Sequence, residues 1–272
     1  MMGKLARGGF GKPWIKASKT IRGNSLTDFL TYSHADYHDK VVVKNEGWLI
    51  RYAALATMGL LDYQDREGVR GVLFEIGVCA ARYFSVLMRT GKLAGDPVVG
   101  LDPFLWIDEE TVRNRLGDLL PDVPYTFLNG CSTAYTARDL RRVFNDVPAR
   151  FVSIDGSHEA SDVMWDLRLT EELLHPHGFV AVDDFFNPVA LGVNEGVHRF
   201  FQNPRALVPF ATFANKLFLC RPHKLDAFKQ AVAEYAETDQ SEFHPKFFIE
   251  HRNAGNKVIE QTLWGTKLYT FG

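Results

Sequence analysis

Cysteine is scarce in this chain of 272 residues, which has only Cys79, Cys131 and Cys220. The number is odd, the spacing is wide, and no C-x-x-C pair occurs. Small secreted domains carry dense, even sets of cysteines, and zinc sites use closely spaced pairs. These absences exclude a disulfide framework and a cysteine zinc site, and they predict reduced, mostly buried thiols.

Long apolar runs are also missing from the sequence. No stretch approaches the roughly 18 consecutive apolar residues that a membrane helix needs. The N-terminal residues lack the apolar core of a secretory signal. With 46% hydrophobic and 24% charged residues, the composition is typical of a globular protein. We therefore expect no membrane span and a cytoplasmic location.

The chain has no excess of positive charge. It contains 31 lysines and arginines against 33 aspartates and glutamates, but six of the basic residues, from Lys4 to Arg22, precede the first acidic residue, Asp28. The remaining 25 basic and 33 acidic residues give the body a charge of −8, which disfavours a nucleic-acid partner. The basic arm is interpreted as a solubilising terminus or as a contact for an anionic substrate or surface.

From residue 72 onward, runs of β-branched and aromatic residues alternate with longer stretches of helical periodicity. This alternation predicts a parallel sheet with crossover helices. The fold is expected to be α/β, a Rossmann-like, doubly wound and mostly parallel seven-stranded sheet with N-terminal helical additions. Its expected strands are Val72–Val78, Val98–Phe104, Tyr125–Asn129, Phe151–Ile154 and Gly178–Asp183, followed by an antiparallel hairpin of Ala206–Phe213 and Lys216–Cys220.

Apolar residues at helical spacing predict the helices, including one over Gly47–Arg66 and one that contains Val163, Leu167 and Leu174. We expect three regions in the chain. Residues 1–68 form an arm and helical cap, residues 69–222 form the core, and residues 223–272 form a C-terminal helix and tail packed on it. The aromatic tail is a candidate interface of a homo-oligomer.

Acidic residues end nearly every predicted strand, where ligands of an open parallel sheet bind. They are Glu75, Asp102, Asp155 and the pair Asp183 and Asp184. A single one of them is explained equally well as a cap or turn residue, but so many in one crevice need donors or cations to offset their repulsion. Ribose hydroxyls of a nucleoside suit Glu75 and Asp102, and a divalent metal such as magnesium suits the three aspartates.

The first loop, EIGVCAARYF, lacks the G-x-G-x-x-G pattern, and no Walker lysine follows it. Both absences argue against a dinucleotide or a nucleoside triphosphate. A ligand without a pyrophosphate, held by its sugar and base, fits better. His158, three residues after Asp155 in IDGSH, is a candidate general base beside a metal-bound hydroxyl, or else a residue that caps the following helix.

These residues resemble a known family, the class I S-adenosylmethionine-dependent methyltransferases. In particular, the chain is similar to metal-dependent O-methyltransferases of the macrolide sugar type and, more distantly, to catechol O-methyltransferase. The resemblance covers about residues 70–220. Its most specific parts are IDGSH and HGFVAVDDFFNP, whereas EIG and GLD are shared more widely.

The resemblance implies S-adenosylmethionine as the cofactor, Mg²⁺ or another divalent cation as the metal, and His158 as the base. The implied metal ligands are Asp155, Asp183 and Asp184. The stretch from Asn129 to Ser132 corresponds to the part that lies along the adenine. The implied cofactor-binding residues are Glu75, Gly77, Ala81, Asp102, Cys131, Ser132 and Asp155.

The chain departs from the family pattern at three positions of the cofactor site. Cys131 stands where many relatives carry an acid, Tyr83 stands at a position that is often small and hydroxylated, and Ala81 replaces a glycine. An alanine is tolerated in this loop if its φ is negative.

The implied reaction is the methylation of a hydroxyl group. The metal lowers the pKa of the hydroxyl, His158 takes its proton, and the alkoxide attacks the sulfonium methyl group in line. A sugar is the preferred small-molecule acceptor and a small phenol the alternative. Asn187 and Phe185 are candidates for contact with the acceptor.

Two other functions stay open at this point. A metal-dependent hydrolase with a Rossmann-like fold would use the three aspartates and His158 on another substrate, but it would leave Glu75 and Asp102 without a task. A non-catalytic cofactor-binding protein is suggested by Ala81, Tyr83 and Cys131.

Overall fold

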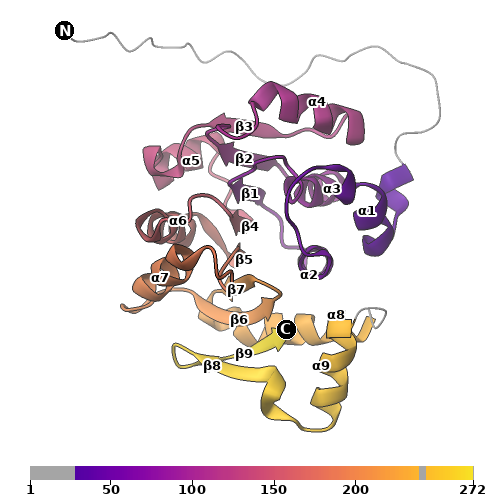
Figure 1. Ribbon diagram of the computed structural model, residues 1–272, viewed down its shortest axis with the longest axis vertical. Helices are drawn as coiled ribbons and strands as arrows, with labels where there is room; N and C mark the ends of the chain where they lie inside the picture. The colour runs from indigo at the N-terminus through magenta and orange to yellow at the C-terminus, as the bar shows by residue number, and fades with distance from the viewer. Residues whose placement is uncertain (1–27, 239–242, 272) are drawn as a thin grey trace.

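The computed structural model describes residues 28–238 and 243–271. Within them, the strands form one nine-stranded sheet with the order β3-β2-β1-β4-β5-β7-β6-β9-β8 (Figure 1). The strands are β1 (Val72–Ile76), β2 (Val98–Asp102), β3 (Thr126–Asn129), β4 (Ala149–Ile154), β5 (Leu174–Val182), β6 (Val208–Phe213), β7 (Lys216–Cys220), β8 (Glu260–Leu263) and β9 (Thr266–Phe271).

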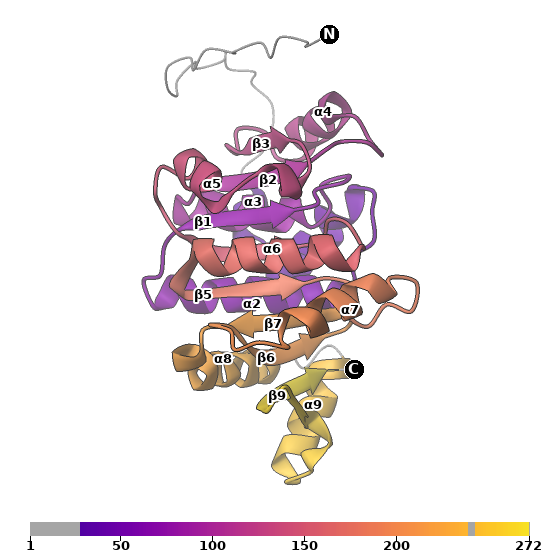
Figure 2. The same cartoon turned by 90° about the vertical axis from the view of Figure 1, so that its left-hand side faces the viewer.

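The first five strands are parallel. β1 pairs with β2 on one side and with β4 on the other, and β3 and β5 extend the sheet outward. The chain therefore reverses its direction across the sheet between β1 and β4, and ligands of such sheets bind beyond the carboxyl ends of the strands at this reversal. Figure 2 shows the arrowheads of β1 and β5 pointing to the same edge.

The sheet has two strands more than the predicted seven. β6 and β7 form the predicted antiparallel hairpin, and β7 is antiparallel to β5. β9 then pairs in parallel with β6, and β8 pairs with β9. The tail gave no strand signal because β8 is an edge strand with no fully buried residue, so apolar and polar residues do not alternate along it.

Helices cover both faces of the sheet, and the buried apolar residues form one cluster on each face. In Figure 1, α5, α6 and α7 lie on one face, and α2, α3 and α8 lie on the other. The helices are α1 (His34–Lys40), α2 (Arg51–Arg66), α3 (Phe84–Ala94), α4 (Glu109–Leu119), α5 (Ala137–Val143), α6 (Ala160–Leu173), α7 (Leu191–Phe200), α8 (Leu225–Thr238) and α9 (Phe243–Asn253).

One helical stripe was predicted a residue too long. Val163 and Leu167 lie on α6, but Leu174 is the first residue of β5. The helix passes into the strand without a connecting loop. Leu174 therefore continues the helical spacing of the apolar residues although it lies in the sheet.

The C-terminal residues continue the core of the protein. α8 packs against α2 and β6, and the rings of Phe213, Phe248 and Phe271 stack on one another between the sheet and α9. None of the helices in the described ranges has the length and apolarity to cross a membrane. The basic arm from Lys4 to Arg22 lies outside the described residues.

Alternation along β1 decides where Glu75 points. Val72, Phe74 and Ile76 belong to the apolar cluster under α5, α6 and α7, and Leu73 belongs to the cluster under α2 and α3. Because successive side chains of a strand point to opposite faces, Glu75 shares the face of Leu73.

Candidate active site

The loop after β1 begins at Gly77, which the packing of the site requires to be glycine. Its φ is +88°, and a Cβ atom here would lie 1.9 Å from the carbonyl oxygen of Asp155. The Gly77 amide donates to the carbonyl of Leu101 at 2.8 Å. The ends of β1, β2 and β4 therefore meet closely at this residue.

The same loop contains two non-glycine residues in the left-handed region. The φ of Cys79 is +47° and that of Ala81 is +65°. The expectation that Ala81 has a negative φ, which would make an alanine tolerable here, is therefore wrong. Such residues cost about 1–2 kcal/mol each, and their surroundings must hold them. The Asn45 side chain donates to the carbonyl of Ala81 at 3.2 Å, and Ala81 is fully buried.

Asp102, at the end of β2, joins the first loop to the second. Its Oδ2 accepts from the Cys79 amide at 2.8 Å, and its Oδ1 accepts from the Phe104 amide at 2.6 Å. Each carboxylate oxygen keeps a further lone pair. The backbone thus fixes the carboxylate in an orientation from which it can accept hydrogen bonds from a ligand.

Glu75 lies deeper in the molecule, with 1% of its surface exposed and one carboxylate oxygen without a hydrogen-bond partner. Burial raises the pKa of Glu75 well above its ordinary value, and the Lys216 ammonium offsets part of this effect. The charges of Asp102 and Asp183 also act on this carboxyl group.

Cys131 and Ser132 follow β3, and the thiol of Cys131 is free and exposed. The carbonyl of Ser132 accepts from the Trp165 indole at 3.2 Å. Beneath them, Asp166 of α6 is completely buried. Burial raises its pKa to about 7, and neither of its carboxylate oxygens has a hydrogen-bond partner.

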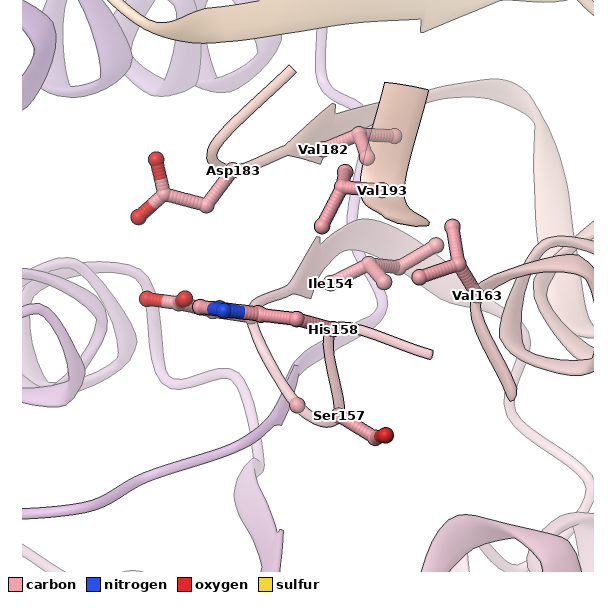
Figure 3. Close-up of a pocket in the computed structure, with 9 residues that line it drawn as sticks. Ile154, Ser157, His158, Val163, Val182, Asp183 and Val193 are labelled. Carbon is pink, nitrogen blue, oxygen red and sulfur yellow. The ribbon is translucent and has the colours of Figure 1, made fainter. Parts of the chain in front are cut away.

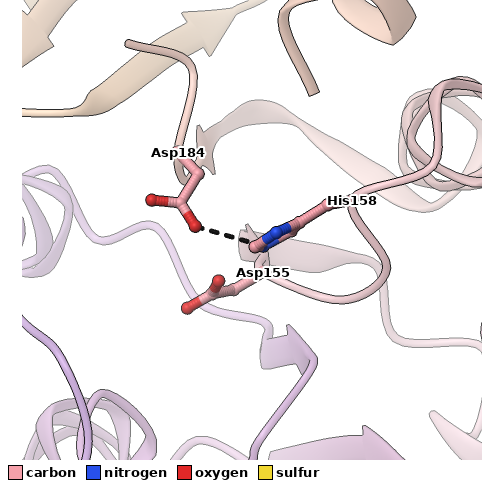
Figure 4. Close-up of side chains that lie close together, drawn as sticks. All are labelled: Asp155, His158 and Asp184. Atoms are coloured by element: carbon pink, nitrogen blue, oxygen red, sulfur yellow. Dashed lines mark ion pairs between the residues drawn. The ribbon is translucent and has the colours of Figure 1, made fainter. Parts of the chain in front are cut away.

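Asp155, His158 and Asp184 come together at the edge where β4 and β5 end, and Figure 4 shows their side chains converging. One donor atom from each lies within 4.8 Å of the others. His158 Nε2 is 3.1 Å from Asp184 Oδ2. Two carboxylates and an imidazole at this spacing are a donor set for a divalent cation or for proton transfer.

Two asparagines hold Asp184 in place. Its Oδ1 accepts from the Asn187 amide at 2.9 Å and from the Asn215 amide at 2.8 Å. Asp184 has a φ of +57°, which turns the chain sharply after β5. Its Oδ2 is thereby left to His158.

Asp183 has a different partner, the ammonium group of Lys216 at the start of β7. Lys216 Nζ is 2.5 Å from Asp183 Oδ2, and both side chains are buried. Burial would raise the pKa of Asp183, but the Lys216 charge and hydrogen bonds hold it below its ordinary value. Burial and the charge of Asp183 raise the pKa of Asp155 well above its ordinary value.

Lys216 was not singled out from the sequence. The only signal was a lysine that begins the apolar run KLFLC, and lysines at strand ends usually lie in solvent. Its position beside three acidic residues became visible only when β7 was placed next to β5.

One side of the site is partly apolar. A small pocket is lined by Ile154, Val163, Val182 and Val193, and Asp183 and His158 also line it (Figure 3). Phe185 is buried and packs against Phe186, His198 and Trp264. Of the two aromatic residues after Asp184, Phe186 is the one with an exposed ring.

Residues 74–185 match a family model described as a methyltransferase domain. The matched range begins in β1 and includes Glu75, Asp102, Asp155, His158 and Asp184. Residues 74–185 are therefore similar to a methyltransferase domain. The predicted resemblance to the methyltransferases is confirmed over these residues. Comparison with curated proteins gives no match.

Solved structures similar to this chain confirm the predicted Rossmann-like fold. CalS11, a TDP-rhamnose 3′-O-methyltransferase of calicheamicin biosynthesis, is 17% identical with a TM-score of 0.51, over 72% of this chain and 90% of that one. The O-methyltransferase NovP is 17% identical with a TM-score of 0.50, over 61% and 78%. A putative O-methyltransferase from Klebsiella pneumoniae is 14% identical with a TM-score of 0.50, over 73% and 90%.

Proposed function

We propose that this methyltransferase moves the methyl group of S-adenosylmethionine to a hydroxyl oxygen of a small-molecule acceptor, with a sugar as the preferred class. One observation carries the proposal. Glu75 and Asp102, which suit a nucleoside, lie at the same edge of the sheet as the cluster of Asp155, His158 and Asp184. All five residues fall within the range that matches a methyltransferase domain.

The residues around the first loop fit the cofactor. Gly77 leaves room where a Cβ atom would strike Asp155, and two backbone amides orient Asp102 toward a ribose. Glu75 keeps an unpartnered oxygen beneath the loop, and Cys131 and Ser132 border the adenine side. When bound, S-adenosylmethionine supplies an electrophilic methyl group.

His158 is proposed as the general base. The tautomer in which Nε2 donates to Asp184 leaves Nδ1 with a lone pair that can accept the acceptor's proton. Asp184 stabilises the imidazolium that forms, because its own orientation is fixed by Asn187 and Asn215. His158 is also exposed enough to reach an acceptor, with 46% of its side-chain surface accessible.

Asp155 and Asp184 also fit a divalent cation, because their donor atoms lie within 4.8 Å of each other and of His158. Mg²⁺ is commonly bound through one or two carboxylates, and Asp155 and Asp184 supply them. A cation here would lower the pKa of a hydroxyl bound to it. Asn187 steadies Asp184 and lies beside the acceptor in this proposal.

Binding of S-adenosylhomocysteine to the full chain tests the cofactor. At about 100 times its Kd, this ligand should raise the free energy of unfolding by about 2.7 kcal/mol, and thermal unfolding measures the shift. Release of S-adenosylhomocysteine in the presence of nucleotide-linked deoxyhexoses or catechols tests the acceptor class. The absence of any thermal shift at saturation contradicts the proposal.

Replacement of the base separates binding from chemistry. His158→Ala should lower kcat by about 10²–10⁴-fold and leave the thermal shift with S-adenosylhomocysteine unchanged. His223→Ala, beyond the end of β7 at the opposite edge of the sheet, is the matched control. An unchanged kcat in His158→Ala would remove His158 from the mechanism.

A further inference from the structure

Lys216 is a buried lysine at the edge of the site, beyond the residues that match the methyltransferase domain. Only 1% of its surface is exposed. Its ammonium group is 2.5 Å from Asp183 Oδ2 and 4.5 Å from the centre of the Tyr83 ring. The Tyr83 hydroxyl in turn shares a hydrogen bond of 2.7 Å with Thr57 of α2.

Both oxygens of Asp183 are already engaged in this arrangement. Oδ1 accepts from the Asp184 amide at 2.8 Å, and Oδ2 faces the Lys216 ammonium. Asp184 differs, because its Oδ2 meets only the imidazole of His158, which is exposed. The side chain of Asp183 is 9% exposed and that of Asp184 is 16% exposed, and only Asp183 faces an ammonium group.

The turn between β6 and β7 supplies different partners to Asp183 and Asp184. Asn215 and Lys216 are consecutive residues at the tip of the hairpin between β6 and β7. Asn215 donates to Asp184, while Lys216 pairs with Asp183. The hairpin thus directs one carboxylate to the acceptor side and keeps the other inside the protein.

The surroundings of the Lys216 ammonium group hold it in place. Asp183, Asp155 and Glu75 all act on it or lie beside it, and Tyr83 covers it with an aromatic face. Moving it away would leave buried carboxylates without a compensating charge, which is costly in a protein interior.

We propose that Lys216 is a positioning residue that withdraws Asp183 from the cation-binding set, so that Asp155 and Asp184 hold a divalent cation without it. This inference rests on the proposed function of the site and specifies its ligands. It replaces the set of three aspartates that the sequence suggested. The Lys216 ammonium group lies beside Asp183, where a cation would have to lie if Asp183 were its third ligand.

Binding of Mn²⁺ to the full chain, measured by titration calorimetry without cofactor or acceptor, tests the inference. Lys216→Met should raise Mn²⁺ affinity by about 10-fold or more, the scale on which neighbours of ligands act. The double variant Lys216→Met with Asp183→Asn exchanges an ion pair for a neutral pair. It should bind Mn²⁺ within about 3-fold of the wild-type protein, because Asp183 is no ligand there.

Two results would overturn the inference. One is a Lys216→Met variant that binds Mn²⁺ no more tightly than the wild-type protein. The other is a double variant that loses about 10-fold or more in affinity, since this loss identifies Asp183 as a wild-type ligand. Lys229→Met, which breaks the Lys229 to Glu260 pair at 2.9 Å, is the control and should leave the affinity unchanged.

A second measurement needs no variant that has to fold. In protein with ¹⁵N-labelled lysine, the Lys216 ammonium protons should stay slow to exchange with water when Mg²⁺ is added, because the pair with Asp183 persists. Loss of this resonance through fast exchange at saturation contradicts the inference. Failure of the proposed function is seen separately, as a missing thermal shift with S-adenosylhomocysteine.

Discussion

Asp183 and Asp184 have the same chemistry and different environments. Asp183 is enclosed with the Lys216 ammonium, whereas Asp184 is held at one oxygen by two asparagine amides and faces His158 with the other. A carboxylate that bonds to a histidine orients the ring and stabilises its protonated form. At the scale of single residues, the partners thus divide the site into a fixed interior pair and an accessible pair of Asp184 and His158.

Asp166 makes stability depend on pH at the same scale. Burial raises the pKa of its carboxyl from 3.8 to about 7, so the folded protein binds this proton more tightly than the unfolded chain does. The stability that the proton contributes is complete below about pH 4 and is lost as the pH rises through about 7.

Asp166→Asn, which is neutral at every pH, is therefore expected to be more stable than the wild-type protein at about pH 8, by about 1–3 kcal/mol. At about pH 3.5, below the ordinary pKa of an aspartate, the two should differ little. Urea unfolding at both pH values measures the difference, with Asp118→Asn on the exposed side of α4 as control. Equal stabilities at about pH 8 would argue against a buried charge at this position.

At the scale of elements, α7 fixes the loop that carries His158. Gly192, in the first turn of α7, approaches so closely that a Cβ atom on it would lie 2.1 Å from the carbonyl oxygen of His158. Gly196, one turn later, similarly packs on Ala160 at the start of α6. Two glycines on one helix face thus allow α7 to lie directly against the loop after β4.

Gly192→Ala should displace the His158 loop, because backbone on both sides must move to admit a methyl group. We expect kcat to fall by about 10-fold or more, with the affinity for S-adenosylhomocysteine little changed. Gly117→Ala on α4 is the control, since its Cβ atom meets nothing within 4 Å, and it should stabilise the protein by about 0.5–1 kcal/mol. An unchanged kcat in Gly192→Ala would mean that the loop position does not matter.

At the scale of the whole molecule, Arg150 connects the N-terminal helices to the sheet at the edge opposite the site. It lies near the start of β4 and is completely buried. Its guanidinium group contacts Asp65 of α2 at 2.9 Å and Asp96, ahead of β2, at 2.8 Å. One cation thus compensates two acids from distant parts of the chain.

Arg150→Met should lower the free energy of unfolding by about 3–5 kcal/mol, because it leaves Asp96 buried without its partner. Adding Asp96→Asn should restore part of the loss. Arg199→Met, which removes an exposed pair with Glu195 on α7, should cost about 0.5 kcal/mol or less. Chemical denaturation measures the free energy of unfolding of each variant. A loss for Arg150→Met as small as that for Arg199→Met would contradict the structural role of Arg150.

Local patterns predicted most of the sheet and left particular parts of the site undetermined. The β7 strand has the predicted bounds, and α2 ends at the predicted Arg66. The conformation of Ala81 was not predictable, because its positive φ depends on contacts such as the one with Asn45, 36 residues earlier. Strands β8 and β9 were missed because β9 pairs with β6 of the distant hairpin and β8 pairs with β9, so both depend on a contact that forms only on folding.

The sequence by itself determined that acidic residues end the central strands, because strand periodicity and the residue types at strand ends are local properties. Parallel strands bring those ends to one edge, so the general location of the site followed as well. Only the tertiary structure decided which partner each carboxylate has. Asp183 and Asp184 are neighbours in the chain, but their partners Asn215 and Lys216 arrive from a later hairpin, and contacts between distant segments exist only after folding.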